Sequence, residues 1–305
     1  MTRFARDYRR IARKLGTVEL MAQSMDDSFM PEDLGLSGGP DERRGPRRFL
    51  DFYGSDGLRL GFRKYGLERS LEERGYGDIT LETDADDSRH VLRVEGTTPG
   101  LEGPQLLIEM VVRRDRLVPG PDSPIEREHE VLTLDWLTMR DPARPFSESR
   151  PRLPGQDAPG LGMGEQILEV LYRVTERLEL DGLAGVADHF HNAVIYSREL
   201  SFVEREPAAR HRALVDALLG REELSLSQAA WSLEWELVTD EAGQPFEHDP
   251  APQVHAFAPD LAAHLRDEAR RRAILERAAS LTVSFDRATF DERWAAGDWV
   301  SPSDE

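Results

Sequence analysis

Residues 160–178, GLGMGEQILEVLYRVTERL, decide how this chain is interpreted. Three glycines at alternate positions precede a run in which apolar side chains recur every three or four residues, which is the spacing of one helix face. We expect the helix to begin at the glycines, where its backbone N–H groups and its dipole can bind an anion such as a pyrophosphate. The alternative is a flexible hinge between the preceding loop and the helix. The expected apolar face consists of Ile167, Leu171, Val174 and Leu178.

The segments before the glycines predict one helix and several strands. Alternating apolar residues are typical of half-buried strands, and continuous apolar runs are typical of central ones. Five prolines between Arg140 and Gly160 then predict a long irregular loop, a kind of segment that is often functional. The expected elements are a helix at 58–73 and strands at 78–83, 90–94, 106–112 and 130–139.

The segments after the helix continue the alternation of strands and helices, which indicates an α/β or α+β fold. Directly after the helix we expect a strand at 183–187, a helix at 192–200 and a strand that begins at Phe202. The patterns beyond residue 205 predict helices at 208–219 and 260–279 and strands at 231–238 and 281–285.

The first 48 residues differ from the rest in charge and pattern. They begin with a predicted short amphipathic helix whose polar face is basic, and residues 23–48 predict a loop or flexible arm. The basic helix either docks on the chain's own acidic body or contacts an anionic partner or a membrane surface. Its apolar face consists of Phe4, Tyr8, Ile11 and Leu15, and its basic face of Arg6, Arg9, Arg10 and Arg13.

The composition excludes several classes of protein. The 305 residues include no cysteine, which excludes a thiol nucleophile, a disulfide scaffold and a Cys₄ zinc site. With 39 basic against 58 acidic residues, the net charge of -19 argues against nucleic-acid binding. No run of about 18 apolar residues and no secretory leader is present, so we expect a cytoplasmic protein that does not interact with membranes. The oligomeric state stays open, a homodimer included.

Three short motifs resemble parts of known catalytic sites. The stretch from Gly35 to Gly39 matches the G-x-S-x-G pattern, but no strand precedes it and Pro40 follows it, so we do not expect a nucleophilic serine. Neither of the two lysines, Lys14 and Lys64, lies in a phosphate-binding loop motif. His129 is not followed by a second histidine at the spacing of a metalloprotease helix.

His189 and His191 form the remaining candidate for metal chemistry. On a strand, both imidazoles would point to the same face and could bind a metal ion. The alternative is a strand-to-helix corner in which the histidines cap and fill polar gaps. Because Asp188 and Asn192 flank the pair, we favour the corner and assign no metal site.

The glycines and the segment from 193 to 204 together resemble the GNAT superfamily of acyl-CoA-dependent N-acetyltransferases. The acyl-CoA signature of that superfamily, Q/R-x-x-G-x-G/A, is matched at its glycines and departs at Pro159. Its A-x-x-x-Y-x-x-x-G-F-x-E ending is matched in part: Ser201 replaces the glycine, and Tyr196 lies one residue before the tyrosine position. The matching residues of this second motif are Ala193, Phe202 and Glu204.

The resemblance covers residues 58–204 and implies a fold and a cofactor site. The fold would be a mixed, mostly antiparallel central sheet flanked by helices, within a domain at 49–205, with an arm at 1–48 and a C-terminal α/β extension at 206–305. Acetyl-CoA would be the co-substrate, with its pantetheine arm along the strand at 130–139. The residues implied in binding it are Leu137, Met139, Leu161, Gly162, Met163, Gly164 and Glu165.

The resemblance also implies direct transfer of an acetyl group to an amine. That reaction needs a base for the amine proton and a proton donor for the leaving thiolate. By position, Asp135 is the first candidate base, Glu109 the second, and Tyr196 the candidate acid. Each candidate also has a structural alternative: Asp135 pairs with an arginine, Glu109 is a solvated edge residue, and Tyr196 packs in the core. The acidic body favours a cationic acceptor, either a small-molecule amine or a basic peptide.

Three hypotheses about function therefore remain. The first is an acyl-CoA-dependent N-acyltransferase. The second is a catalytically inactive member of the same fold that acts as a binding or regulatory protein, because Pro159, Ser201 and the displaced tyrosine depart from the superfamily pattern. The third is a metal-dependent hydrolase that uses His189 and His191.

Overall fold

The computed structural model describes residues 2–23, 47–86, 88–118, 125, 127–147 and 150–299. It divides into two compact units, each of which is drawn from three segments of the chain. Unit 1 comprises Met1–Arg114, Thr133–Ala143 and Gly160–Leu178, and unit 2 comprises Asp115–Leu132, Arg144–Pro159 and Glu179–Glu305. The predicted boundaries at residues 49 and 206 stay predictions.

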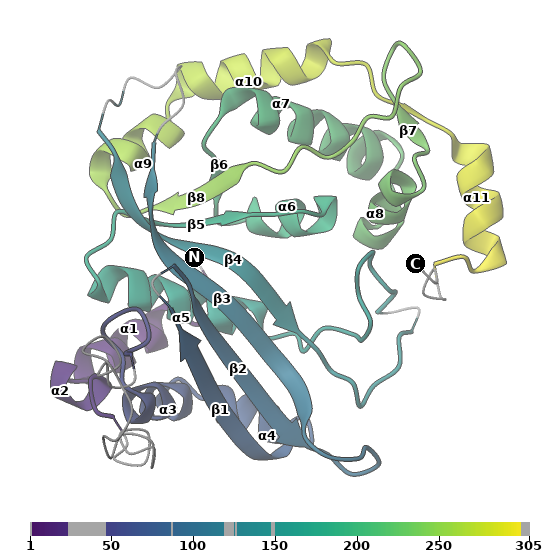
Figure 1. Ribbon diagram of the computed structural model, residues 1–305. Helices are drawn as coiled ribbons and strands as arrows, with labels where there is room; N and C mark the ends of the chain where they lie inside the picture. The colour runs from purple at the N-terminus through teal and green to yellow at the C-terminus, as the bar shows by residue number, and fades with distance from the viewer. Residues whose placement is uncertain are drawn as a thin grey trace, which may run out of the picture. The chain divides into compact units, whose positions relative to one another are not determined.

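A seven-stranded sheet runs in the order β1-β2-β3-β4-β5-β8-β6 (Figure 1). The pairings β1·β2, β2·β3, β5·β8 and β6·β8 are antiparallel. A mixed α/β fold with a mostly antiparallel sheet flanked by helices, as expected, is therefore confirmed at this level. The strands are β1 (Gly77–Ala85), β2 (His90–Thr97), β3 (Gln105–Leu117), β4 (His129–Met139), β5 (Gly182–Val186), β6 (Ser201–Phe202) and β8 (Pro252–Ala256), and a separate pair is formed by β7 (Val238–Thr239) and β9 (Ser284–Phe285).

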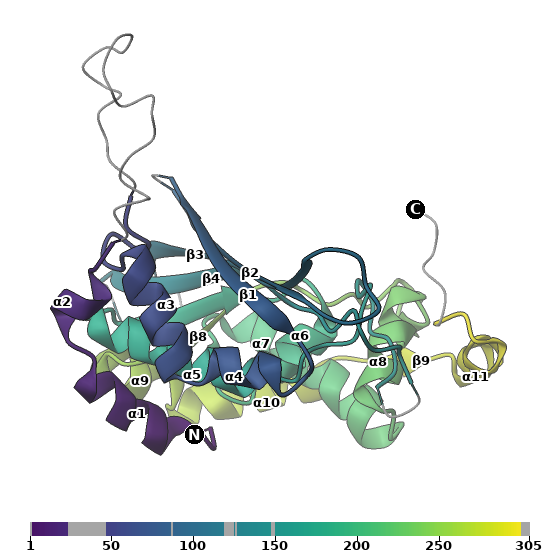
Figure 2. The ribbon, with the colours of Figure 1, turned by 90° about the horizontal axis from the view of Figure 1, so that it is seen from below.

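In the described part of unit 1, five helices accompany β1, β2, β3 and the Thr133–Met139 part of β4. Figure 2 shows α3, α4 and α5 on one side of β1, β2 and β3. The single helix expected at 58–73 is wrong: the chain forms α3 and α4, because Gly66 between them adopts a left-handed conformation with φ of 74°. The helices are α1 (Ala5–Lys14), α2 (Thr17–Leu20), α3 (Ser55–Lys64), α4 (Leu67–Glu72) and α5 (Gly164–Arg177).

The amphipathic pattern at 160–178 gives the helix α5 that was expected. Ile167, Leu171 and Val174 face a cavity whose opposite wall includes Ile108 and Met110 of β3. The predicted N-terminal helix is also present as α1, and it packs against α5 within unit 1. Of the two alternatives for this basic helix, docking on the chain's own body is thus observed. Most of the predicted arm, residues 24–46, lies outside the described part of the chain, and so does the motif at 35–39.

In unit 2, short strands are surrounded by helices with their own apolar core. The expected helix at 192–200 begins earlier, at Phe190, and the one at 208–219 begins at Arg205 and ends in π-helical geometry over Val215–Arg221. The helices are α6 (Phe190–Tyr196), α7 (Arg205–Leu214), α8 (Leu226–Glu234), α9 (Pro259–Leu265), α10 (Glu268–Ser280) and α11 (Arg287–Ala296). The core includes Phe190, Leu214, Leu218, Val238, Phe246 and Phe290.

Two further predictions for unit 2 are wrong in part. Residues 231–234, half of the strand expected at 231–238, belong to helix α8, because Ser225 and Gln228 form a capping box that starts a helix just before them. Trp231 and Trp235 lie one helical turn apart and their rings are in tilted contact, with centroids 5.5 Å apart; this i, i+4 pair also fits the alternation of a strand. The helix expected at 260–279 is two helices, α9 and α10. Asp267 caps the second of them, because its side chain accepts a hydrogen bond from the backbone N–H of Arg270.

Within the described residues, no helix is both long enough and apolar enough to cross a lipid bilayer.

Candidate functional site

The glycine turn before α5 exposes its backbone. Gly160, Gly162 and Gly164 are exposed, whereas the side chains of Leu161 and Met163 between them are buried in unit 1. Gly162 has a φ of 67°, a conformation that glycine adopts more readily than any other residue. Among the described residues, the backbone N–H groups from Gly162 to Glu165 have no hydrogen-bond partner. The turn therefore presents unpaired amides at the positive end of a 14-residue helix.

A guanidinium group from another part of the chain faces this turn. Arg74, which precedes β1, donates from Nε to the carbonyl oxygen of Leu161 at 2.8 Å and from Nη1 to the carbonyl oxygen of Ser70. Its Nη2 lies 3.9 Å from the place that a Cβ atom on Gly162 would occupy. Arg74 could not be predicted from the sequence, because no motif marks residue 74 and it lies far along the chain from the turn.

The end of β4 meets the same turn. A Cβ atom placed on Gly160 would lie 3.7 Å from the carbonyl oxygen of Met139. One placed on Gly164 would lie 3.7 Å from Cε of the same methionine. Leu137, two residues earlier, is half-buried on the same side of the strand. The structure thus brings the predicted residue Met139 together with the predicted residues of the turn, which include Leu161, Met163 and Glu165.

Both candidate bases form ion pairs with arginines. Nε of Arg113 lies 3.1 and 3.0 Å from the two carboxylate oxygens of Asp135. Nε of Arg93 donates to Glu109 at 2.8 Å, between residues that are directly opposite each other on β2 and β3. Pairing with an arginine is the structural alternative that the sequence left open for Asp135. Because all four side chains are at least partly exposed, each pair stabilises the fold by about 0–1 kcal/mol.

The candidate acid, Tyr196, belongs to unit 2. It is the last residue of α6 and packs against a small apolar cluster that includes Ala193 and Phe202. Burial, and to a smaller extent the charge of Asp188, raises the pKa of the Tyr196 phenol. The phenol is therefore protonated at neutral pH, which is the form that a proton donor needs.

The two histidines weighed as metal ligands occupy a strand-to-helix corner, as favoured. His189 is the N-cap residue of α6, and its ring stacks on that of His191 with centroids 5.2 Å apart. Burial, followed by the nearby His189 and His248, lowers the pKa of His191 to about 4. Within the described chain, no group of three or more His, Asp or Glu side chains is arranged to hold a metal ion.

Comparisons of this chain with protein-family models, with curated proteins and with solved structures find no match. A functional proposal therefore rests on the geometry of the site together with the motifs of the sequence.

Proposed function

We propose that this protein is an acyl-CoA-dependent N-acyltransferase whose glycine turn holds the pyrophosphate of the co-substrate. The observation that carries the proposal is the set of unpaired N–H groups from Gly162 to Glu165, with the guanidinium of Arg74 beside them. Amides at a helix N-terminus bind phosphate groups well, and an adjoining arginine adds charge that the amides lack. Leu137 and Met139 would adjoin the rest of the cofactor along β4.

The proposed reaction is a direct attack of an amine on the thioester carbonyl. A C–N bond forms, the C–S bond breaks, and the amine proton passes to a base while the thiolate gains a proton from an acid. We assign the base to Asp135, with Glu109 as the second candidate, and keep Tyr196 as the acid that the sequence resemblance implies. The net charge of -19 favours a cationic acceptor, which is a small amine or a basic peptide.

Calorimetry with acetyl-CoA on wild type and on Gly164→Asp tests the binding step. A Cβ atom at residue 164 would meet only Cε of Met139, at 3.7 Å, so the variant should fold. Its carboxylate would repel a pyrophosphate and reduce binding at least tenfold, while the neutral Gly164→Asn variant should lose much less. An absence of binding to wild type at millimolar acetyl-CoA would refute the proposal.

A catalytically inactive binding or regulatory protein is the second candidate, and a specific observation favours it. Asp135 and Glu109 both have an arginine as direct partner, which holds each carboxylate in place as part of the sheet surface. Incubation of the protein with acetyl-CoA and a panel of amines separates the two candidates. Acetyl-CoA binding with no acetylated amine would support the inactive protein, and turnover at ordinary enzyme rates would exclude it.

A further inference from the structure

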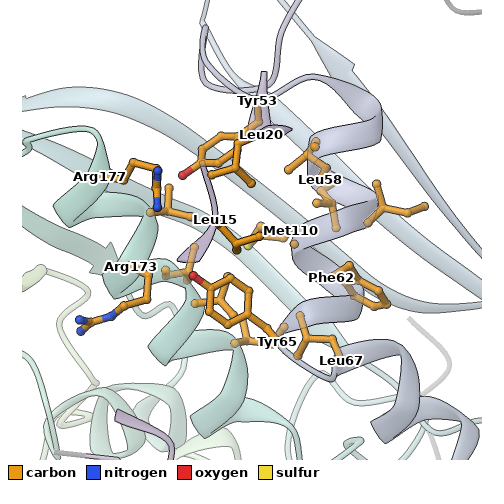
Figure 3. Close-up of a pocket in the computed structure, with 18 of the residues that line it drawn as sticks. Leu15, Leu20, Tyr53, Leu58, Phe62, Tyr65, Leu67, Met110, Arg173 and Arg177 are labelled. Atoms are coloured by element: carbon orange, nitrogen blue, oxygen red, sulfur yellow. The ribbon is translucent and has the colours of Figure 1, made fainter. Parts of the chain in front are cut away.

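An apolar cavity of about 90 Å³ lies inside unit 1, away from the glycine turn. It is bounded by α2, α3 and α5 and by one face of β1, β2 and β3 (Figure 3). Leu20 closes it on the side of the N-terminal helices, and Gly61 of α3 contributes backbone only. The apolar wall includes Leu20, Leu58, Phe62, Met110, Leu171 and Val174.

One end of this cavity is polar. Tyr53 and Tyr65 line it, and Figure 3 shows their phenol oxygens turned to the side on which Arg173 and Arg177 lie. Among the described residues, neither phenol oxygen has a hydrogen-bond partner. Burial raises the pKa of Tyr65 to about 12 and raises that of Tyr53 as well, so both are O–H donors at neutral pH. The cavity thus combines an apolar body with donors at one end.

The same two arginines also line a second, open hollow of about 620 Å³. This hollow adds Arg9 and Arg13 from α1, and among the described residues Glu176 is its only acidic lining residue. In the part of the chain that the structure describes, neither Arg9 nor Arg13 forms an ion pair. With Glu169, the buried partner of Arg173, counted as well, four guanidinium groups against two carboxylates give a local positive charge in a chain whose net charge is -19.

The existing contacts leave part of this charge available. Arg173 is committed, because it pairs with Glu169 at 3.0 Å and with Glu176 at 2.6 Å. Arg177 instead donates from one nitrogen, Nη2, to the carbonyl oxygen of Ala12 at 2.6 Å. Its other N–H groups, together with the two phenols, can meet an anion at the junction of the cavity and the hollow.

We propose that unit 1 binds a small amphipathic anion, with an aliphatic tail in the cavity and a carboxylate or phosphate head at Arg177, Arg9 and Arg13. The tail is short, because the cavity is smaller than the roughly 150 Å³ that accommodates benzene in a protein core. The site is separate from the proposed acyl-CoA site, and it would exist whether or not the protein is an enzyme.

Calorimetric titration with six-carbon probes tests the head and the tail. Hexanoate and hexyl phosphate should bind, whereas hexylamine and hexanol should bind at least tenfold more weakly. Along butyrate, pentanoate and hexanoate, each added methylene should tighten binding about fourfold until the cavity is full. The tighter of the two anions identifies the head group, carboxylate or phosphate. Equal binding of hexanol and hexanoate would overturn the proposal.

Two variants locate the ligand. Gly61→Leu should abolish hexanoate binding by filling the cavity, since a Cβ atom at residue 61 would have no atom within 4 Å. If the leucine variant does not fold, the smaller Gly61→Ala substitution serves as the test, and it should weaken the binding of the longest acid most.

The head group is tested at Arg177. Arg177→Gln should weaken binding at least tenfold, while Arg6→Gln, which removes a charge from α1 outside the hollow, should leave binding unchanged. Wild-type binding by Gly61→Leu would place the tail elsewhere and refute the proposal.

Discussion

Two sets of buried ionisable side chains, one in unit 1 and one in unit 2, are accommodated in opposite ways. In unit 1, Arg173 and Glu169 of α5 are both almost fully buried and pair with each other at 3.0 Å. In unit 2, burial lowers the pKa values of His191 and His211 to about 4, so both are neutral at pH 7. The stability contributed by a buried ion pair depends on the partner residue, whereas the stability contributed by a buried neutral histidine depends on pH. The comparison predicts which unit each perturbation will affect.

The largest expected effect is the loss of the buried ion pair in unit 1. Arg173→Ala leaves the carboxylate of Glu169 buried without its cation and should lower the free energy of unfolding by about 3–5 kcal/mol. Urea denaturation followed by circular dichroism measures this loss. Glu176→Gln removes the exposed partner of the same arginine and should cost less than about 1 kcal/mol. Equal losses in the two variants would show that burial does not determine how much these ion pairs contribute to the free energy of unfolding.

The next effect is the loss of stability of unit 2 in acid. The histidine pKa is near 6.5 in the unfolded chain and about 4 in the folded one, so the unfolded state binds the extra proton as the pH falls. Stability is complete above pH 6.5 and should fall between pH 6.5 and 4, by about 1.4 kcal/mol per pH unit for each histidine.

Hydrogen exchange at pH 7 and pH 5, corrected for intrinsic rates, locates this loss. Protection should fall more in α6 and α7 than in α5. Burial and the neighbouring His248 and Arg212 all disfavour a proton on His211, so His211→Phe should reduce the pH dependence. Unit 1 also buries His90, whose pKa is lowered chiefly by burial. An equal loss of protection in the two units would contradict the prediction that acid destabilises unit 2 more than unit 1.

A smaller effect is expected at the glycine turn of unit 1. Gly162→Ala should cost about 1–2 kcal/mol, because a side chain disfavours the left-handed backbone at this residue. Gly160→Ala is the matched control, since its Cβ atom would meet only the carbonyl oxygen of Met139, at 3.7 Å. Thermal unfolding of both proteins gives the difference. Equal midpoints would show that the turn is held by contacts and not by its backbone conformation.

The smallest effect on stability is expected at the exposed ion pair of Asp135 and Arg113. Asp135→Asn should change the free energy of unfolding by less than about 1 kcal/mol, because the pair is about one-third exposed. If Asp135 is the base, the same variant should lose most of its acetyl transfer while keeping acetyl-CoA affinity. Full transfer by Asp135→Asn, with Glu109→Gln inactive, would move the assignment to β3.

The sequence predicted those parts of the fold in which local periodicity and burial agree. Helix α5 and the strands β1 to β5 were placed within a few residues of their ends, because their apolar patterns face one side of unit 1 or unit 2. The prediction at 231–238 was wrong because two tryptophans four residues apart fit both periods, and only the capping box at Ser225 distinguishes them. For the candidate site, the sequence motifs indicated both the glycine turn and Met139. They did not indicate Arg74, because a contact between residues 74 and 161 leaves no local pattern in the sequence.

The division into interleaved segments has a consequence for synthesis on the ribosome. Unit 1 needs the residues up to Leu178, and the chain passes between the units five times along its length. After Arg114 has been added, the nascent chain must wait about 3–13 s for the rest of unit 1 at roughly 5–20 residues per second. During that interval β1, β2 and β3 lack the helix α5 that covers their apolar face. We therefore expect chains truncated between residues 114 and 160 to bind chaperones or to aggregate, and neither unit to be obtained by cutting the gene at one point.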